Sequence, residues 1–337
     1  MTVNTTEFSR LVTEYLTDYL PLQRNYSHNT VCSYKDALKL FVRFVREEKN
    51  INWSEFSMKE FNRSLVIEYL EWLRRNGSGT TTTNQRLAAL KSFVDYAGIE
   101  NVEYLKNLQS VISIKQTKTS SREIEYLSVE QISKLINFPN VNTPTGLRHR
   151  VVLTLLYDSG ARVQELIDIQ IRDFHSGSDP TVRLHGKGDK YRTVVISDNT
   201  GKLVSEYIAR QRRFAPGSNP LIVNRSKDKM SRDGIRYIIE KYCAEIRKYD
   251  SSFPEEIHPH MFRHSKAMHM LAAGINVVYI RDFLGHEDIS TTMIYAKADN
   301  RLKTEAITKL APKLTGETPF GDWSQNQDLL DFLNSFK

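Results

Sequence analysis

The stretch HPHMFRHSKAMHMLAAGINVVYIRDFLGHEDISTTMIYAK, residues 258–297, decides how the second half of this chain folds. Its apolar spacing predicts a helix over 261–273 that ends at Gly274. A second helix is predicted over 277–284 and ends at Gly285, because glycine commonly follows the last turn of a helix. The stretch therefore predicts two short helices joined by a tight turn.

Four side chains of this stretch suit chemistry on a phosphodiester. Arg263 offers a planar fork for phosphate oxygens, and His260 and His286 can donate or move a proton near neutral pH. Tyr295, expected on a short helix that begins near residues 288–291, can form a covalent intermediate when its neighbours activate it. Taken singly, such a tyrosine or histidine is more often a core or surface residue, so the prediction rests on the combination.

The order of these residues resembles the tyrosine recombinases and phage integrases, including the Xer-type site-specific recombinases. The shared features are H-x-x-R-H, then L-G-H, then a tyrosine nine residues after that histidine. LLYDSGARVQELIDIQIRDF, residues 155–174, resembles the first catalytic box of the family, and HGKGDKYR, residues 185–192, resembles its lysine-bearing β-hairpin. The resemblance implies six catalytic residues and one residue that orients them: Arg162, Lys187, His260, Arg263, His286 and Tyr295, with Glu165.

The resemblance also implies a mechanism. Tyr295 attacks the scissile phosphate and forms a 3′-phosphotyrosyl link, while Arg162 and Arg263 stabilise the developing charge. His286 adds a hydrogen bond, Lys187 protonates the leaving 5′-oxygen, and His260 handles the tyrosine proton. No cofactor and no metal ion is expected, since arginines supply the positive charge.

Length and composition agree with this class of protein. A chain of 337 residues favours two domains, and a formal net charge of +7 suits a polyanionic partner. No apolar run approaches a membrane span, and the first residues lack the layout of a secretory signal. The two cysteines make no metal-ligand spacing and are expected to be reduced, so a cytoplasmic location is predicted.

The first third of the chain predicts a small helical bundle. Amphipathic periodicity indicates four helices joined by short links: 5–24, 27–48, 65–75 and 84–97. We expect residues 1–112 to be a core-binding domain that contacts DNA. The threonine run before the fourth helix is either a simple loop and N-cap or a phosphate contact; the expected DNA contacts here are Thr81, Thr82, Thr83, Arg86 and Lys91.

The remaining boundaries follow composition and the resemblance. Residues 113–124 are polar and basic, and the linker they predict places Lys115, Lys118 and Arg122 near DNA phosphates. Residues 125–311 are expected to form the catalytic domain, with two strands around the glycine-rich turn at 186–190. The expected fold class is mainly α with a small β-sheet, and the family implies a two-domain C-shaped clamp.

The C-terminal tail, residues 312–337, has proline and glycine followed by an apolar segment. This pattern predicts either packing on its own domain or, as the family implies, docking on a neighbouring copy. The expected partners are double-stranded DNA and the protein itself, as a dimer on one site and a tetramer in the synapse, with accessory DNA-bending or directionality proteins in some systems.

The function predicted from these features is integration, excision or transposition of a mobile element by a site-specific DNA recombinase. Three alternatives stay open: an Xer-like resolvase of replicon dimers, an enzyme resembling type IB topoisomerases, and a relative that binds DNA without cleaving it. A helical DNA-binding regulator of another class would explain the charge but not the full set of motif residues.

Overall fold

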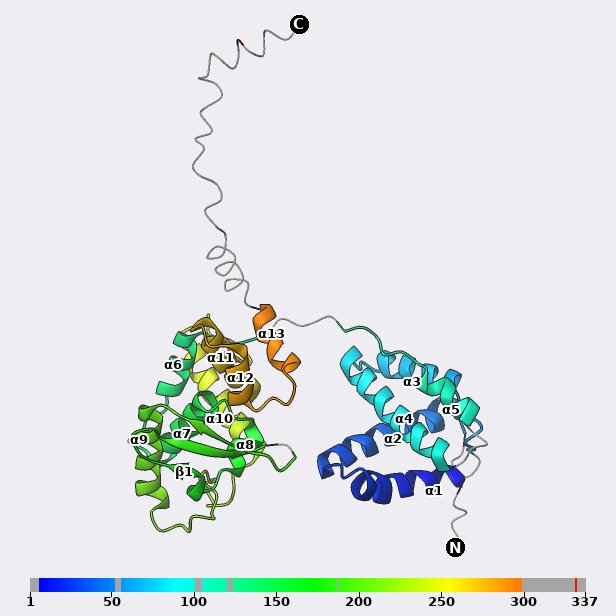
Figure 1. Cartoon of the computed structure of the whole chain (residues 1–337), viewed down its shortest axis with the longest axis horizontal. Coiled ribbons are helices and arrows are strands. Elements are labelled where there is room, and N and C mark those ends of the chain that lie inside the picture. Colours follow the sequence, from blue (N-terminus) through cyan, green and yellow to red (C-terminus); the bar gives the residue numbers. More distant parts are fainter. Residues whose placement is uncertain are drawn as a thin grey trace. The chain divides into compact units, whose positions relative to one another are not determined.

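The computed structural model describes residues 6–51, 56–100, 105–119, 124–186, 188–298 and 331. Predictions for Lys187, Arg122 and the docking of the tail lie outside these residues. The chain divides into two compact units, Met1–Arg122 and Glu123–Lys337 (Figure 1). Within the described ranges, no helix has the length and apolar character needed to cross a membrane.

Unit 1 is a helical bundle, as predicted. Its core is dominated by rings that pack edge-on or tilted, such as Phe41 against Tyr69 and Phe8 against Phe93. Ser27 and Asn62 begin helices with their side chains accepting backbone N–H groups. The elements are α1 Glu7–Glu14, the π-helix η1 Tyr15–Gln23, α2 His28–Lys49, α3 Arg63–Arg75, α4 Thr80–Glu100 and α5 Leu105–Ile112.

The threonine run differs from the sequence prediction. We expected a polar turn before a helix that begins at Asn84, whereas α4 already begins at Thr80. Thr83 is 1% exposed, and its hydroxyl donates to the Gly79 carbonyl over 3.1 Å. This bond satisfies the hydroxyl of Thr83, so the side chain can be buried within the first turn of α4.

Unit 2 contains the small sheet and the remaining helices, so the expected fold class is confirmed. The strands are antiparallel in the order β1-β2-β3, and His185 pairs with Tyr191 where the predicted hairpin closes. The strands are β1 Phe174–His175, β2 Thr181–His185 and β3 Tyr191–Val195; the helices are α6 Val129–Asn137, α7 Pro144–Asp158, α8 Val163–Asp168, the 3-10 helix η3 Ile171–Asp173, α9 Asp198–Tyr207, the π-helix η4 Ile208–Arg212, α10 Arg232–Arg247, α11 Pro259–Ala272, α12 Val277–Leu284 and α13 Ser290–Ala298.

Helix α11 connects the core of unit 2 to its C-terminal helices. It contacts α7 on one side and α12 and α13 on the other, and these helices lie together in Figure 1. Gly160 follows α7 with φ +59, and a side chain there would lie 2.9 Å from the Phe283 ring of α12. The close approach of α7 and α12 therefore needs glycine at this position.

The start of α7 offers a test of this packing. A Cβ atom on Gly146 would lie 1.9 Å from the Asn140 carbonyl oxygen, so Gly146→Ala must displace backbone. We expect it to lower the free energy of unfolding of unit 2 by about 2–3 kcal/mol, measured by urea denaturation. Gly177→Ala is the matched control, because no atom lies within 4 Å of the added Cβ. Equal stability of the two variants would contradict the packing described.

Candidate active site

The carboxylate of Glu165 is the centre of a buried ion-pair cluster. Its side chain is 4% exposed and accepts hydrogen bonds from Arg162 Nη1 at 2.7 Å and from Arg192 Nη2 at 2.8 Å. Burial alone would raise the pKa of Glu165, but its bonds to Arg192 and Arg162 outweigh that effect and hold the pKa at about 2. The carboxylate is therefore ionised at neutral pH.

Arg162 and Glu165 meet through the end of a helix rather than along its face. Two residues three positions apart within one helix would share a face. Instead Arg162 is the extended N-cap residue of α8, and its backbone N–H donates to Glu165 Oε2 over 2.8 Å. The carboxylate thus binds the backbone and the side chain of the same arginine, which fixes where the guanidinium lies.

Arg263 is held by the ends of two helices. Its side chain is buried, and it donates to the carbonyls of Gly160 and Leu284 at 2.8 and 2.7 Å. These carbonyls stand after α7 and at the end of α12, where helix carbonyls lack intrahelical partners. Burial first, and then the charge of Arg162, lower the pKa of Arg263 to about 9. Nη1 of Arg263 lies 4.0 Å from Oε2 of Glu165.

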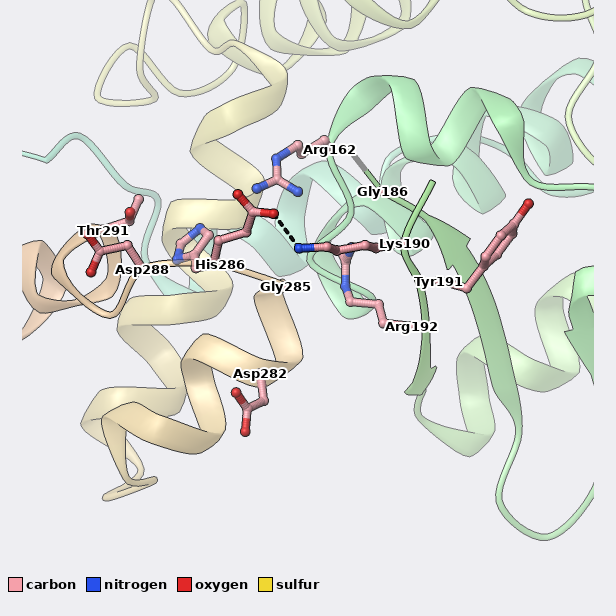
Figure 2. A pocket seen from close by; sticks show the side chains of 11 residues that line it. Arg162, Gly186, Lys190, Tyr191, Arg192, Asp282, Gly285, His286, Asp288 and Thr291 are labelled. Atoms are coloured by element: carbon pink, nitrogen blue, oxygen red, sulfur yellow. Dashed lines mark hydrogen bonds and ion pairs between the residues drawn. The ribbon is translucent and has the colours of Figure 1, made fainter. Parts of the chain in front are cut away.

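A cavity of about 510 Å³ opens beside this cluster (Figure 2). Arg162, Arg192, His286 and Lys190 line it, and Lys190 pairs with Glu287, which lines it too. His286 Nδ1 lies 2.8 Å from Thr292 Oγ1. Burial and then the nearby arginines lower the pKa of His286 to about 4, so the ring is neutral at pH 7. The side chains of Arg162, Arg192 and His286 can therefore donate hydrogen bonds to an anion in this cavity.

Tyr295 lies on α13 with its ring in an apolar cluster. It is 2% exposed and packs with residues of α11 and α12 that include Met268, Ile280 and Leu284. Its hydroxyl oxygen lies 2.8 Å from Nδ1 of His264. Burial raises the pKa of Tyr295, while the charges of Arg263 and Arg162 act in the opposite direction.

The structure places most of the predicted site residues in one region of unit 2. Arg162, Glu165 and Arg263 are within one ion-pair cluster, and the arginine charges also act on His286 and Tyr295. His260 is exposed on α11, one turn before His264. Among the described residues, no group of three or more His, Cys, Asp or Glu side chains could hold a metal ion.

The residues of unit 1 that were predicted to contact DNA differ in exposure. Thr81, Thr82, Lys115 and Lys118 are exposed, while Arg86 is half-buried. Thr83 is buried, so its predicted contact with DNA is wrong: its hydroxyl is bonded inside the helix. Lys91 donates to the Ile114 carbonyl and so fastens the segment that follows α5 to α4.

Sequence reasoning missed two residues of the site, Arg192 and His264. Each closes a motif that was quoted for other reasons: Arg192 ends HGKGDKYR, and His264 ends the H-x-x-R-H run. Arg192 also donates to the Phe283 carbonyl, and a Cβ on Gly285 would lie 2.9 Å from its Cδ. The sequence did offer a signal for both: each motif contains a further basic residue beyond those assigned to catalysis, Arg192 in the first and His264 in the second.

Comparison with known proteins gives matches over both units. The model of the phage integrase family matches residues 125–301, and that of the phage integrase N-terminal SAM-like domain matches residues 12–101. The chain is 30% identical to tyrosine recombinase XerD of Halalkalibacterium halodurans over 295 residues, which are 87% of this chain and 94% of XerD.

Two further matches are an integrase/recombinase and a transposon integrase. A Sinorhizobium fredii protein that carries the name integrase/recombinase y4rC is 26% identical over 327 residues, 96% of this chain and 97% of that protein. The solved structure of the Tn1549 transposon integrase in complex with transposon right end DNA has a TM-score of 0.67 at 16% identity, covering 89% of this chain and 99% of that chain. At 16% identity, the similarity to the Tn1549 integrase shows a shared fold.

The ion-pair cluster predicts that the free energy of unfolding depends strongly on Arg192. Arg192→Ala leaves a buried carboxylate with one partner fewer, and we expect the free energy of unfolding to fall by roughly 3 kcal/mol at pH 7. Arg236→Ala, which breaks an exposed pair with Glu240 on α10, should cost less than about 1 kcal/mol. Similar losses in both variants would contradict the central place of Arg192.

The same variant predicts a pH dependence. In the wild type, the low pKa of Glu165 stabilises the fold above the unfolded-state pKa, and this contribution is lost as the pH falls towards about 2. Without Arg192 the folded-state pKa rises, so the contribution is smaller and is lost at higher pH. The stability gap between wild type and Arg192→Ala should therefore narrow as the pH falls from about 5.

Proposed function

The chain belongs to the phage integrase family of tyrosine recombinases, and on that premise we propose that it cuts and rejoins DNA through Tyr295. Members of this family are site-specific DNA recombinases. The Tyr295 oxygen attacks the scissile phosphorus, forms a 3′-phosphotyrosyl link and releases a 5′-hydroxyl. The observation that carries this proposal is the hydroxyl of Tyr295, which is held 2.8 Å from His264, the sequence neighbour of Arg263, and whose pKa is raised by burial while the charges of Arg263 and Arg162 act to lower it.

The charge balance of the cluster supports a phosphate as its missing partner. Three guanidinium groups, those of Arg162, Arg192 and Arg263, surround the single carboxylate of Glu165. Arg162 is one-third exposed and lines the cavity, so it can receive a phosphate oxygen. Fixed positive groups of this kind stabilise the charge that develops on phosphorus without needing to reorganise.

The remaining roles concern protons and hydrogen bonds. His286, neutral and held at Nδ1 by Thr292, can offer its other ring nitrogen to a non-bridging oxygen. Lys187, which lies outside the described residues, is proposed to protonate the leaving 5′-oxygen. The proton of the Tyr295 hydroxyl passes to a histidine of α11. Glu165 acts by holding the arginines.

The proposed biological role is integration, excision or transposition of a mobile element. The S. fredii integrase/recombinase and the Tn1549 transposon integrase support it, and the DNA in the latter's structure supports double-stranded DNA as the substrate. The second candidate is resolution of replicon dimers, which the 30% identity to XerD favours. Sequencing DNA that is covalently captured by the protein in cells discriminates them, since captured sites lie either at element ends or at one replicon locus.

The test of the nucleophile needs a DNA probe. Duplexes are selected by binding from a random-sequence pool, and the selected site is then prepared with a nick at each position in turn. Wild-type protein should become covalently attached to one of these nicked duplexes. Tyr295→Phe should bind the same duplex without attachment, because only the hydroxyl is lost. An adduct with this variant would move the nucleophile elsewhere, for example to the exposed Tyr279 or Tyr191.

The two arginines proposed to bind the phosphate, Arg162 and Arg263, predict a loss in the rate of covalent attachment that exceeds any loss of DNA binding. Arg162→Ala and Arg263→Ala should each slow covalent attachment by about 3–5 kcal/mol of activation free energy, while binding to the selected duplex falls much less. Arg236→Ala on α10, whose partner is Glu240 on the surface, serves as the control and should cleave like wild type. Near wild-type rates in both site variants would show that the arginines have been wrongly assigned.

A further inference from the structure

Three histidines at the N-terminal end of α11 lead from solvent to Tyr295: His258, which is the N-cap residue, and His260 and His264 on the helix. His258 and His260 are exposed, and His264 lies half-buried one turn further along the helix. The ring centroids are 6.3 Å apart for His258 and His260, and 6.5 Å apart for His260 and His264. The innermost ring, that of His264, makes the 2.8 Å hydrogen bond with the Tyr295 hydroxyl.

We propose that His264, rather than His260, takes the proton of the Tyr295 hydroxyl as that oxygen attacks phosphorus. The inference rests on the proposed function of Tyr295. It follows from geometry: a general base must lie within hydrogen-bond reach of the proton that it removes, and His264 Nδ1 is within that reach. His260, the residue that the family resemblance favours for this role, lies a full turn of the helix away.

The step balances as follows. Neutral His264 carries its hydrogen on Nε2, and its Nδ1 lone pair accepts the hydrogen bond from the Tyr295 hydroxyl. The O–H bond breaks, the proton moves to Nδ1, and the oxygen forms the new bond to phosphorus. The bond from phosphorus to the 5′-oxygen breaks, and that oxygen is protonated by a separate acid. His264 becomes an imidazolium and returns the proton to the tyrosine when a 5′-hydroxyl reverses the reaction.

The surroundings of His264 keep its ring neutral, which is the form that can accept a proton. Burial first, then His260, the N-cap residue His258 and Arg263 lower the pKa of His264 to about 4. The other groups that face it are Tyr295 on α13 and His286 in the turn after α12. A DNA phosphate bound near Arg263 would offset part of the positive potential, so the basicity of His264 should rise when the substrate is bound.

The alternative is that the hydrogen bond between His264 and Tyr295 stabilises the fold and has no part in catalysis. The described residues of unit 2 contain two other histidine–tyrosine hydrogen bonds of similar length: His269 Nδ1 to Tyr157 Oη and His149 Nδ1 to Tyr242 Oη, each at 2.9 Å. Neither of these tyrosines has a proposed chemical role. His269 is on α11 as well, so its replacement is a matched control for the loss of a buried histidine–tyrosine bond on the same helix.

The experiment measures single-turnover attachment of the protein to the nicked selected duplex between pH 5.5 and 9. We expect His264→Asn to slow attachment by about 10²–10⁴-fold, the usual contribution of a general base. Its rate should rise about tenfold per pH unit, because hydroxide must now remove the tyrosine proton, whereas the wild-type rate stays nearly flat. His269→Asn should keep the wild-type pH profile, whatever it does to stability.

A second substrate separates the base from the acid. Sulfur in place of the bridging 5′-oxygen gives a leaving group that needs no proton. The defect of His264→Asn should therefore persist on this substrate, whereas a defect in leaving-group protonation should disappear. Melting temperature and affinity for the duplex are measured for His264→Asn and His264→Gln, and both variants should still bind.

Several results would overturn the inference. Attachment by His264→Asn at the wild-type rate or faster would make His264 a spectator or a restraint on the tyrosine. A pH-dependent defect in His260→Asn without one in His264→Asn would return the role to His260. Loss of duplex binding in both His264 variants would make the bond structural. Attachment by Tyr295→Phe would instead refute the proposed function, so the two failures are distinguishable.

Discussion

The carboxylate of Glu165 is the constraint on which the rest of the site depends. A buried charge is costly unless it is paired and hydrogen-bonded, and this carboxylate accepts bonds from Arg162 and Arg192 on different elements. Meeting that requirement draws the start of α8 and strand β3 together. Arg192 extends the connection to the end of α12 through the Phe283 carbonyl. The ion pairs thereby fix the walls of the cavity.

Arg263 shows a second way of keeping a charge inside the protein. Its guanidinium binds carbonyls where α7 and α12 end, and the negative ends of helix dipoles favour a cation there. A carbonyl is not a full counterion, so the positive charge is not neutralised. The cluster therefore keeps an excess of positive charge. The carbonyls of Gly160 and Leu284 hold the Arg263 guanidinium in place without cancelling its charge. A site built in this way is prepared for an anionic substrate.

Tyr295 connects this charged cluster to the apolar packing of α11, α12 and α13. Its ring is part of the packing, while its hydroxyl reaches His264. Burial makes the free tyrosine a weak acid, so a nucleophile in this position depends on a nearby base. The same helix α11 carries Arg263 and His264 as sequence neighbours: one side chain lies with the charged cluster and the other with the tyrosine.

The sequence alone determined the helices around the site and the family to which the chain belongs. The glycines at 274 and 285 and the apolar spacing between them predicted α11 and α12 closely, because helix ends and periodicity are local properties. The threonine run was misjudged, since Thr83 is stabilised in its helix by a bond that propensity does not reveal. Only the tertiary structure decided which groups meet. Arg192 reaches Glu165 across 27 positions, and His264 reaches Tyr295 across 31, and such pairings depend on packing between elements rather than on spacing along the chain.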